Sequence, residues 1–291
     1  MSDTSPFDDP DVYYLYRYKP SVAVAAVSCA LFAVATGVHI FKMYRSRAWF
    51  LVPLVLGGLF EVIGFAARAY SATQKAPDWS LGPFIIQSVL TLVAPALFAG
   101  SIYMILGRVI LMTDGERYSM VRQKWLTKTF VCGDIFAFLL QSAGAGLMSS
   151  SSMSKTGEWV VVGGLIFQII FFGLFVVVAF MFHTRLQKSP TTLSLSVPWR
   201  KHLWALYISS ALILIRSIFR VVEFVQGNTG YLFRHEVFMY IFDALLMFGV
   251  VVLFIFVHPG EIRGYLEREK RASGGEGSEI QLEEQFTRPA K

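Results

Sequence analysis

The stretch WALYISSALILIRSIFRVVEF (residues 204–224) decides the fold, because it is long and apolar enough to cross a lipid bilayer as one helix. It nevertheless contains three charged residues, Arg216, Arg220 and Glu223. A charge at the bilayer centre costs about 2.5–3.5 kcal/mol on insertion scales. Their spacing of four and then three residues places them on one stripe of the helix. We therefore expect this stripe to face other helices or a ligand.

The rest of the chain has the same apolar character. Of its 291 residues, 55% are hydrophobic and 16% are charged, and the mean hydropathy is +0.54. We predict an all-α membrane protein, a bundle of seven transmembrane helices. The spans are expected near residues 20–41, 49–71, 83–107, 129–148, 158–182, 203–225 and 237–257. The connections between them are short and leave no room for a catalytic domain, so we expect no enzyme activity and no catalytic residue.

Lysine and arginine residues predict the orientation of the bundle. The loops and tail on one side carry 18 of them, against five on the other side. The positive side normally faces the cytoplasm. We expect an extracellular N-terminal segment (1–19), a seven-span domain (20–258) and a cytoplasmic tail (259–291) that is mostly disordered. The net charge of +6 thus reflects topology and attraction to anionic lipid, and no nucleic-acid partner is expected.

Polar residues in three further spans line up with the charged stripe. Span two contains Glu61 and Arg68, span three contains Gln87, and the last span contains a 4-then-3 pattern of polar residues. Most of these positions lie roughly 6–15 Å from the bilayer centre on the outer side, at 1.5 Å per residue. The predicted substrate-binding residues are Glu61, Arg68, Gln87, Arg216, Arg220, Glu223, Glu236, Tyr240 and Asp243. A separate group of inner polar residues consists of Asp134, Gln141 and Gln168.

Two explanations of the buried charges remain open, and they are not exclusive. The charges can form an ion-pair network that joins spans two, six and seven. They can also line a cavity for a ligand head group that carries phosphate, carboxylate or amine.

Because no two of the five histidines stand four residues apart, we expect no metal site and no cofactor. Pro95 should kink span three and free a backbone carbonyl, most simply as a packing feature.

Other classes of seven-helix protein fit poorly. Glu116-Arg117-Tyr118 occupies the place of a receptor triplet, but span six lacks proline and span seven lacks NPxxY. A retinal protein is excluded because residues 236–257 contain no lysine. The sequence contains no G-x-x-x-x-G-K-[ST] motif for ATP binding.

The spaced polar positions resemble those of a family of fungal seven-helix membrane proteins, the RTA-like or lipid-translocating exporter family. The resemblance covers about residues 14–262. It rests on YKPS (18–21), His39, EVIGFAAR (61–68), Gln87, AP (94–95), Tyr103, Asp134, QSAGAG (141–146), GLIFQ (164–168), RSIFRVVEF (216–224) with Gly227 and Gly230, HEVFMYIFD (235–243) and HPG (258–260).

This resemblance implies a fungal protein of the plasma membrane, or of an endomembrane, that takes part in the movement of lipids or amphiphiles. The partners it implies are membrane lipids or amphiphilic small molecules, such as sphingoid long-chain bases, phospholipids or toxic compounds. Two alternatives stay open. One is a receptor or sensor that binds an amphiphile and signals, and the other is a porphyrin or haem transporter. Protein partners are not indicated.

Overall fold

The computed structural model describes residues 15–75, 78–148, 153–227, 230–262 and 264–265. Throughout these ranges the regular structure is helical, with no β-strand. The helices are α1 (Val22–Ser46), η1 (Trp49–Leu51), α2 (Val52–Thr73), α3 (Leu81–Met112), η2 (Glu116–Tyr118), α4 (Gln123–Met148), α5 (Ser154–Lys188), α6 (Thr192–Ser196), α7 (Trp199–Gln226), α8 (Tyr231–Arg234), α9 (Glu236–Met239), η3 (Tyr240–Leu245) and α10 (Leu246–Phe256). Seven runs in the described part are long and apolar enough to cross a membrane, which confirms the predicted seven-span bundle.

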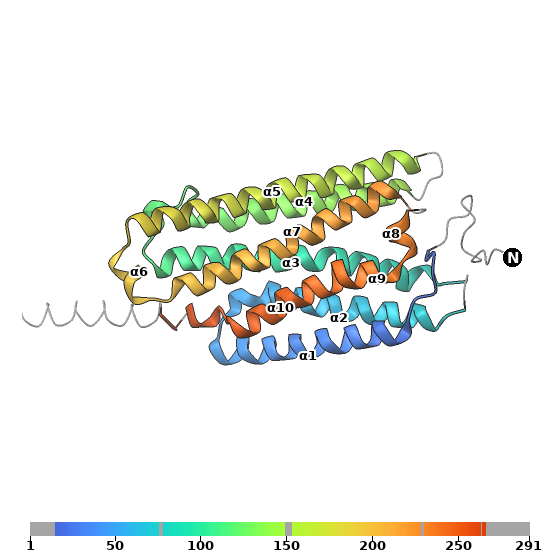
Figure 1. Cartoon of the computed structure of the whole chain (residues 1–291), viewed down its shortest axis with the longest axis horizontal. Coiled ribbons are helices and arrows are strands. Elements are labelled where there is room, and N and C mark those ends of the chain that lie inside the picture. Colours follow the sequence, from blue (N-terminus) through green and yellow to red (C-terminus); the bar gives the residue numbers. More distant parts are fainter. Residues whose placement is uncertain (1–14, 76–77, 149–152, 228–229, 263, 266–291) are drawn as a thin grey trace, which may run out of the picture.

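The spans form a closed ring in chain order. Each of α1, α2, α3, α4, α5 and α7 packs on the next span, and α10 returns to pack on α1. Helices α3 and α7 also pack on each other across the middle (Figure 1). As a result, α3 is the most buried span, and side chains of α2, α7 and the last span can meet beside it.

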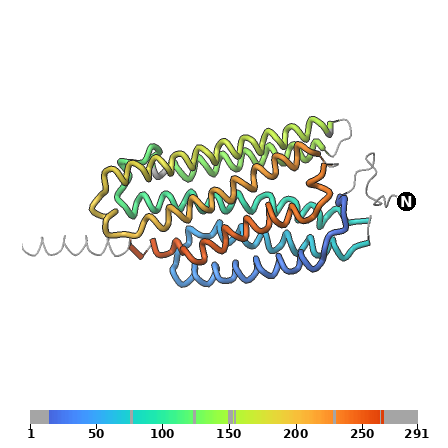
Figure 2. The backbone as a smooth tube through the Cα atoms, in the orientation of Figure 1, coloured from blue at the N-terminus to red at the C-terminus, as the bar shows by residue number. Residues whose placement is uncertain are grey.

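The direction of α1 distinguishes the two ends of the bundle. We name the end at which α1 begins the first end, and the end at which α1 finishes the opposite end. The described chain starts at the first end and finishes at the opposite end (Figure 2). Residues 1–14 and 266–291, which include most of the predicted tail, lie outside the described residues.

Helix boundaries have local causes in the sequence. The hydroxyl of Ser21 caps the first turn of α1, and Arg47 ends that helix in a left-handed conformation with φ of 51°. Gly227 ends α7 with φ of 69°, where a side chain would be strained. Several helices run past the predicted spans, as in α5, which begins at Ser154 and ends at Lys188.

The outer surface of the bundle is apolar, as contact with lipid requires. Val34, Phe41, Trp159 and Phe180 are among the large apolar side chains that are more than half exposed. Inside, α4 and α5 approach closely where glycine faces glycine. A Cβ atom built on Gly144 would lie 2.7 Å from the carbonyl oxygen of Gly157, so neither position has room for a side chain.

Candidate functional site

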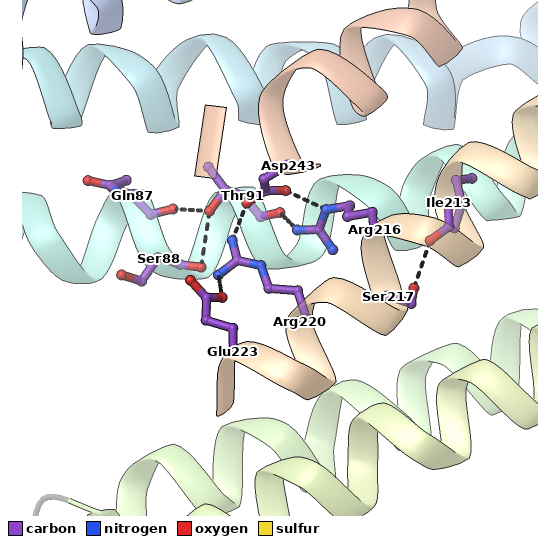
Figure 3. A network of polar contacts seen from close by, with 9 residues as sticks. All are labelled: Gln87, Ser88, Thr91, Ile213, Arg216, Ser217, Arg220, Glu223 and Asp243. Carbon is purple, nitrogen blue, oxygen red and sulfur yellow. Dashed lines mark hydrogen bonds and ion pairs between the residues drawn. The ribbon is translucent and has the colours of Figure 1, made fainter. Parts of the chain in front are cut away.

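Four of the predicted site residues form one ion-pair network, which we name the central charged group. It consists of Arg216, Arg220, Glu223 and Asp243 (Figure 3). The carboxylate of Asp243 accepts hydrogen bonds from both arginines, one on each oxygen. Arg220 also donates to Glu223 Oε2 at 2.9 Å. Two cations and two carboxylates therefore neutralise one another between α7 and the last span.

A fourth contact attaches this group to α3 and gives Pro95 a specific role. Arg216 Nη2 donates a hydrogen bond to the backbone oxygen of Thr91 at 2.7 Å (Figure 3). In a regular helix that oxygen would accept from the amide of residue 95, but proline has no amide hydrogen. The carbonyl freed by Pro95 is thus an acceptor for a buried guanidinium. We expected Pro95 to be a simple packing kink, and this contact adds a polar function to it.

The backbone of the last span is irregular where it supplies Asp243. Residues Tyr240–Leu245 form a π-helical segment between α9 and α10. Such segments are rare and occur often at functional sites, because they hold an extra residue in the turn and redirect side chains. Here the segment places Asp243 between the two arginines of α7.

A second group lies closer to the first end, and we name it the Arg68 group. Arg68 is 1% exposed. Its guanidinium donates to Tyr240 Oη at 3.0 Å, to Tyr18 Oη at 2.8 Å and to Glu236 Oε1 at 2.7 Å. The carboxylate of Glu236 also accepts from the backbone amide of Ser21, at 3.1 Å and 3.0 Å to its two oxygens. This group therefore ties α2 and α9 to the start of α1.

Aromatic rings enclose the guanidinium of Arg68. Its Cζ atom lies 5.6 Å, 5.7 Å and 5.4 Å from the ring centroids of Tyr16, Tyr18 and Tyr240. These distances are typical of cation–π contacts. Burial is the main cause that raises the pKa values of Tyr16 and Tyr18, so both phenols stay neutral at physiological pH. Tyr16 donates to Gln87 Oε1 at 2.7 Å, which places Gln87 beside this group and not in the central charged group.

Glu61 differs from the other predicted carboxylates. It is 1% exposed, and its Oε1 atom is buried with no hydrogen-bond partner among the described residues. The charges that act on it are those of Asp243, Arg216 and Arg220, so it lies next to the central charged group. Within the described chain it makes no ion pair.

The three inner polar residues form two separate contacts, neither of which is an ion pair. Asp134 Oδ2 accepts a hydrogen bond from Tyr103 at 2.9 Å between α4 and α3. Gln141 Nε2 donates to Gln168 Oε1 at 3.0 Å between α4 and α5. Gln141 precedes the end of α4 at Met148 by about 10 Å at 1.5 Å per residue. The amide pair is thus nearer the first end than Asp134 is.

Sequence reasoning missed four contributors to these groups: Tyr16, Tyr18, Ser21 and Thr91. The first three precede α1, outside the spans whose polar stripes predicted the site, although Tyr18 and Ser21 belong to the YKPS sequence that carries the family resemblance. An available signal was the aromatic run YYLYRY at residues 13–18, since tyrosine is enriched at membrane interfaces. Thr91 contributes only its backbone, and its signal was the proline four residues later.

The two groups have limited spare bonding capacity. Each oxygen of Asp243 is engaged, and Arg68 donates to three acceptors. A ligand head group of either charge would have to exchange with these internal partners. Because the partners come from α2, α3, α7, α9 and η3, such an exchange would loosen contacts between spans.

Comparisons with known proteins identify the family of the chain. The family model described as RTA1 like protein matches residues 54–265. The chain is 35% identical to Protein RTA1 of Saccharomyces cerevisiae over 275 residues, which is 86% of each chain. It is also 35% identical to Protoporphyrin uptake protein 1 of the same yeast, over 83% of this chain and 91% of that protein. No solved structure matches the chain.

A more distant relative is named for a lipid. The Sphingoid long-chain base transporter RSB1 of Saccharomyces cerevisiae is 25% identical over 279 residues, covering 83% of this chain and 72% of that protein. Two relatives are thus named for the substance that they move, a long-chain base in one case and protoporphyrin in the other. With seven membrane spans and a family match over most of its length, this chain is an integral multi-pass membrane protein that belongs to the RTA1-like family.

Proposed function

We propose that this protein moves an amphiphilic molecule across a membrane, most simply the plasma membrane, and that it does so without catalysis. The first end of the bundle faces outside and the opposite end faces the cytoplasm, in accord with the excess of lysine and arginine in the loops of the opposite end. The head group of the amphiphile binds among the nine predicted site residues, while its apolar tail lies between helices.

The observation that carries this proposal is the pair of buried charged groups that share the last span. Asp243 belongs to the central charged group and Glu236 to the Arg68 group, seven residues apart. Ionisable groups at such depth are costly, and in membrane proteins they usually mark a substrate pathway. A structural network alone would need neither two clusters nor a carboxyl group without a partner.

The two charged groups offer different chemistry to a head group. Glu236, Glu223 and Asp243 can accept an ammonium, as a long-chain base would present. The three arginines can bind phosphate or carboxylate in a bidentate manner. The relative named as a sphingoid long-chain base transporter favours the first of these.

A flip assay in proteoliposomes tests the proposal directly. Purified protein is reconstituted in phosphatidylcholine vesicles with a fluorescent sphingoid base in one sample and a fluorescent phospholipid in another. We expect protein-dependent transfer of at least one probe between leaflets. The matched control is the double variant Arg216→Met/Asp243→Leu, which removes one cation, one anion and both ion pairs of Asp243 while keeping side chains of similar size. Absence of protein-dependent transfer with both probes would reject translocation of these lipids.

Porphyrin transport is a second candidate, because a relative that is 35% identical is named Protoporphyrin uptake protein 1. A protoporphyrin is a large apolar ring with two carboxylates, so it would be held by arginines. Uptake of protoporphyrin into cells that express the protein, compared with cells that express Arg68→Met, separates this candidate from the first. A long-chain base needs no arginine for its ammonium, whereas a porphyrin does.

A further inference from the structure

The charges around Glu61 balance only when Glu61 itself is neutral. In the central charged group, Arg216 and Arg220 are matched by Asp243 and Glu223. In the Arg68 group, Arg68 is matched by Glu236. An ionised Glu61 would be a further negative charge with no ion pair in the described structure. Burial of an unpaired carboxylate is so costly that such a group normally takes up a proton instead.

Among the described residues, Arg216 and Arg220 are the cations that act on Glu61, and both already have carboxylate partners. On α7 and the last span, the charged groups near enough to interact with it electrostatically are Arg216, Arg220 and Asp243. Between Leu81 and Gly107, α3 contains no charged residue. On α1, the thiol of Cys29 donates to the backbone of Val62 at 3.5 Å, and His39 bonds to the backbone of Val251 at 2.8 Å.

The backbone of α2 holds Glu61 tightly in this position. Gly57 and Gly64 lie about one turn on either side of it, on the face that packs on α3. A Cβ atom on Gly57 would lie 2.6 Å from the Phe98 ring, and one on Gly64 would lie 2.9 Å from Thr91 Cγ2. The side chain of Glu61 is therefore held in the interior beside α3, where it is 1% exposed.

We propose that Glu61 holds an exchangeable proton, which leaves the protein when the ammonium group of a cationic amphiphile enters the central charged group. The carboxylic acid of Glu61 loses its proton to solvent and becomes a carboxylate. The ammonium then neutralises this carboxylate, so one positive charge replaces another. The charge of the membrane interior stays constant. An anionic head group has no such compensation at this site, so the exchange selects amines over carboxylates and phosphates.

This inference rests on the proposed function for its substrate, but the proton itself can be tested without transport. Infrared spectra of the purified protein in lipid nanodiscs should show the carbonyl stretch of a buried carboxylic acid, which shifts in heavy water. We expect part of that band to be missing in Glu61→Gln. Asp134 is a second buried carboxyl group, bonded to a phenol, and it can contribute to the same band. The quantity to measure is therefore the difference between the spectra of wild type and Glu61→Gln. Glu236→Gln, which alters an ion-paired carboxylate, serves as control and should leave the band intact.

Proton release tests the exchange. Hexadecylamine is added to the protein in weakly buffered nanodiscs that contain a pH-indicator dye. Hexadecanoic acid serves as the chain-matched anion. We expect about one proton released per amine bound to wild type, the ratio that electroneutral exchange requires. With hexadecylamine, the Glu61→Gln variant should release no proton, whereas the Glu61→Asp variant should release protons as wild type does. Hexadecanoic acid should cause no proton release from wild type.

The outcomes separate the two proposals. An acid band that depends on Glu61, in a protein that transfers no amphiphile, would support the proton site and reject translocation. Transfer of a sphingoid base by a protein whose Glu61→Gln variant has an unchanged infrared spectrum would overturn the proton site and leave translocation standing. Amine binding with equal proton release from wild type and Glu61→Gln would also overturn it.

Discussion

Helices α4 and α5 are joined by neutral contacts, whereas α2, α7 and the last span are joined by charges. In the first region, Gly144 meets Gly157 and Gln141 bonds to Gln168. In the second region, three arginines meet three partner carboxylates, and Glu61 lies beside them. Neutral packing contacts involve only the two helices that make them. Ion pairs, in contrast, can exchange partners with a charged group that enters the bundle. The difference suggests a scaffold in α4 and α5 and a responsive part in the other spans.

The most disruptive single change should be Asp243→Ala in the charged region. It leaves Arg216 buried without its ion-pair partner and Arg220 with Glu223 alone, and loss of a partner from a buried ion pair costs about 3–5 kcal/mol. Thermal unfolding in detergent, followed by tryptophan fluorescence, measures this loss. The double variant Arg216→Met/Asp243→Leu removes both charges of one pair and should recover part of the stability. A single variant as stable as wild type would mean that the network does not hold these spans together.

In the neutral region, the largest effect is expected from Gly144→Ala. Its added Cβ would lie 2.7 Å from backbone atoms of α5, so the two helices must separate, at a cost of about 1–3 kcal/mol. The matched control is Gly146→Ala, where a Cβ would have no atom within 4 Å. Thermal unfolding should separate the two variants, while the flip rate per folded molecule should be the same in both. A changed flip rate in Gly144→Ala would break the division into scaffold and responsive part.

Glu223→Gln should lower transport more than stability, which is the reverse of the pattern expected for Gly144→Ala. Arg220 keeps Asp243 as its partner, and an amide can still accept one hydrogen bond, so we expect a stability loss of only about 1–2 kcal/mol. Ligand-dependent transport should fall by roughly tenfold, the equivalent of about 1.4 kcal/mol. Abundance in the membrane and the flip rate are measured on the same preparation. If the variant fails to reach the membrane, Glu223 serves the fold and not the ligand.

The smallest effect should come from the amide pair between α4 and α5. Gln141→Leu leaves Gln168 without its partner and should cost about 1 kcal/mol. The double variant Gln141→Leu/Gln168→Leu removes both polar groups and should be close to wild type in unfolding temperature. A double variant that is less stable than the single one would show that the amides have further partners.

The sequence was sufficient for the seven spans, because each needs only length and apolar composition. The stripes on spans two, six and seven also indicated which side chains face inward. The pairing within the stripes was less accessible, since it depends on small rotations of helices that spacing alone does not fix. Gln87 illustrates this: it was grouped with the charges, and it instead bonds to Tyr16. The π-helical segment had no signal in the pattern of residues, because it changes the register by a single position.

That π-helical segment divides the last span into two angular registers. A π-helical turn holds one residue more than an α-helical turn, so removal of one residue between Tyr240 and Leu245 would leave a regular α-helix, with Glu236 and Phe254 still facing Arg68 and the core and only the placement of Asp243 lost. The same deletion within α10 has no extra residue to absorb it. An α-helix turns by about 100° per residue, so there either Glu236 would leave Arg68 or Phe254 would leave the core. The last span should therefore tolerate a change in length at the π-helical segment better than anywhere else.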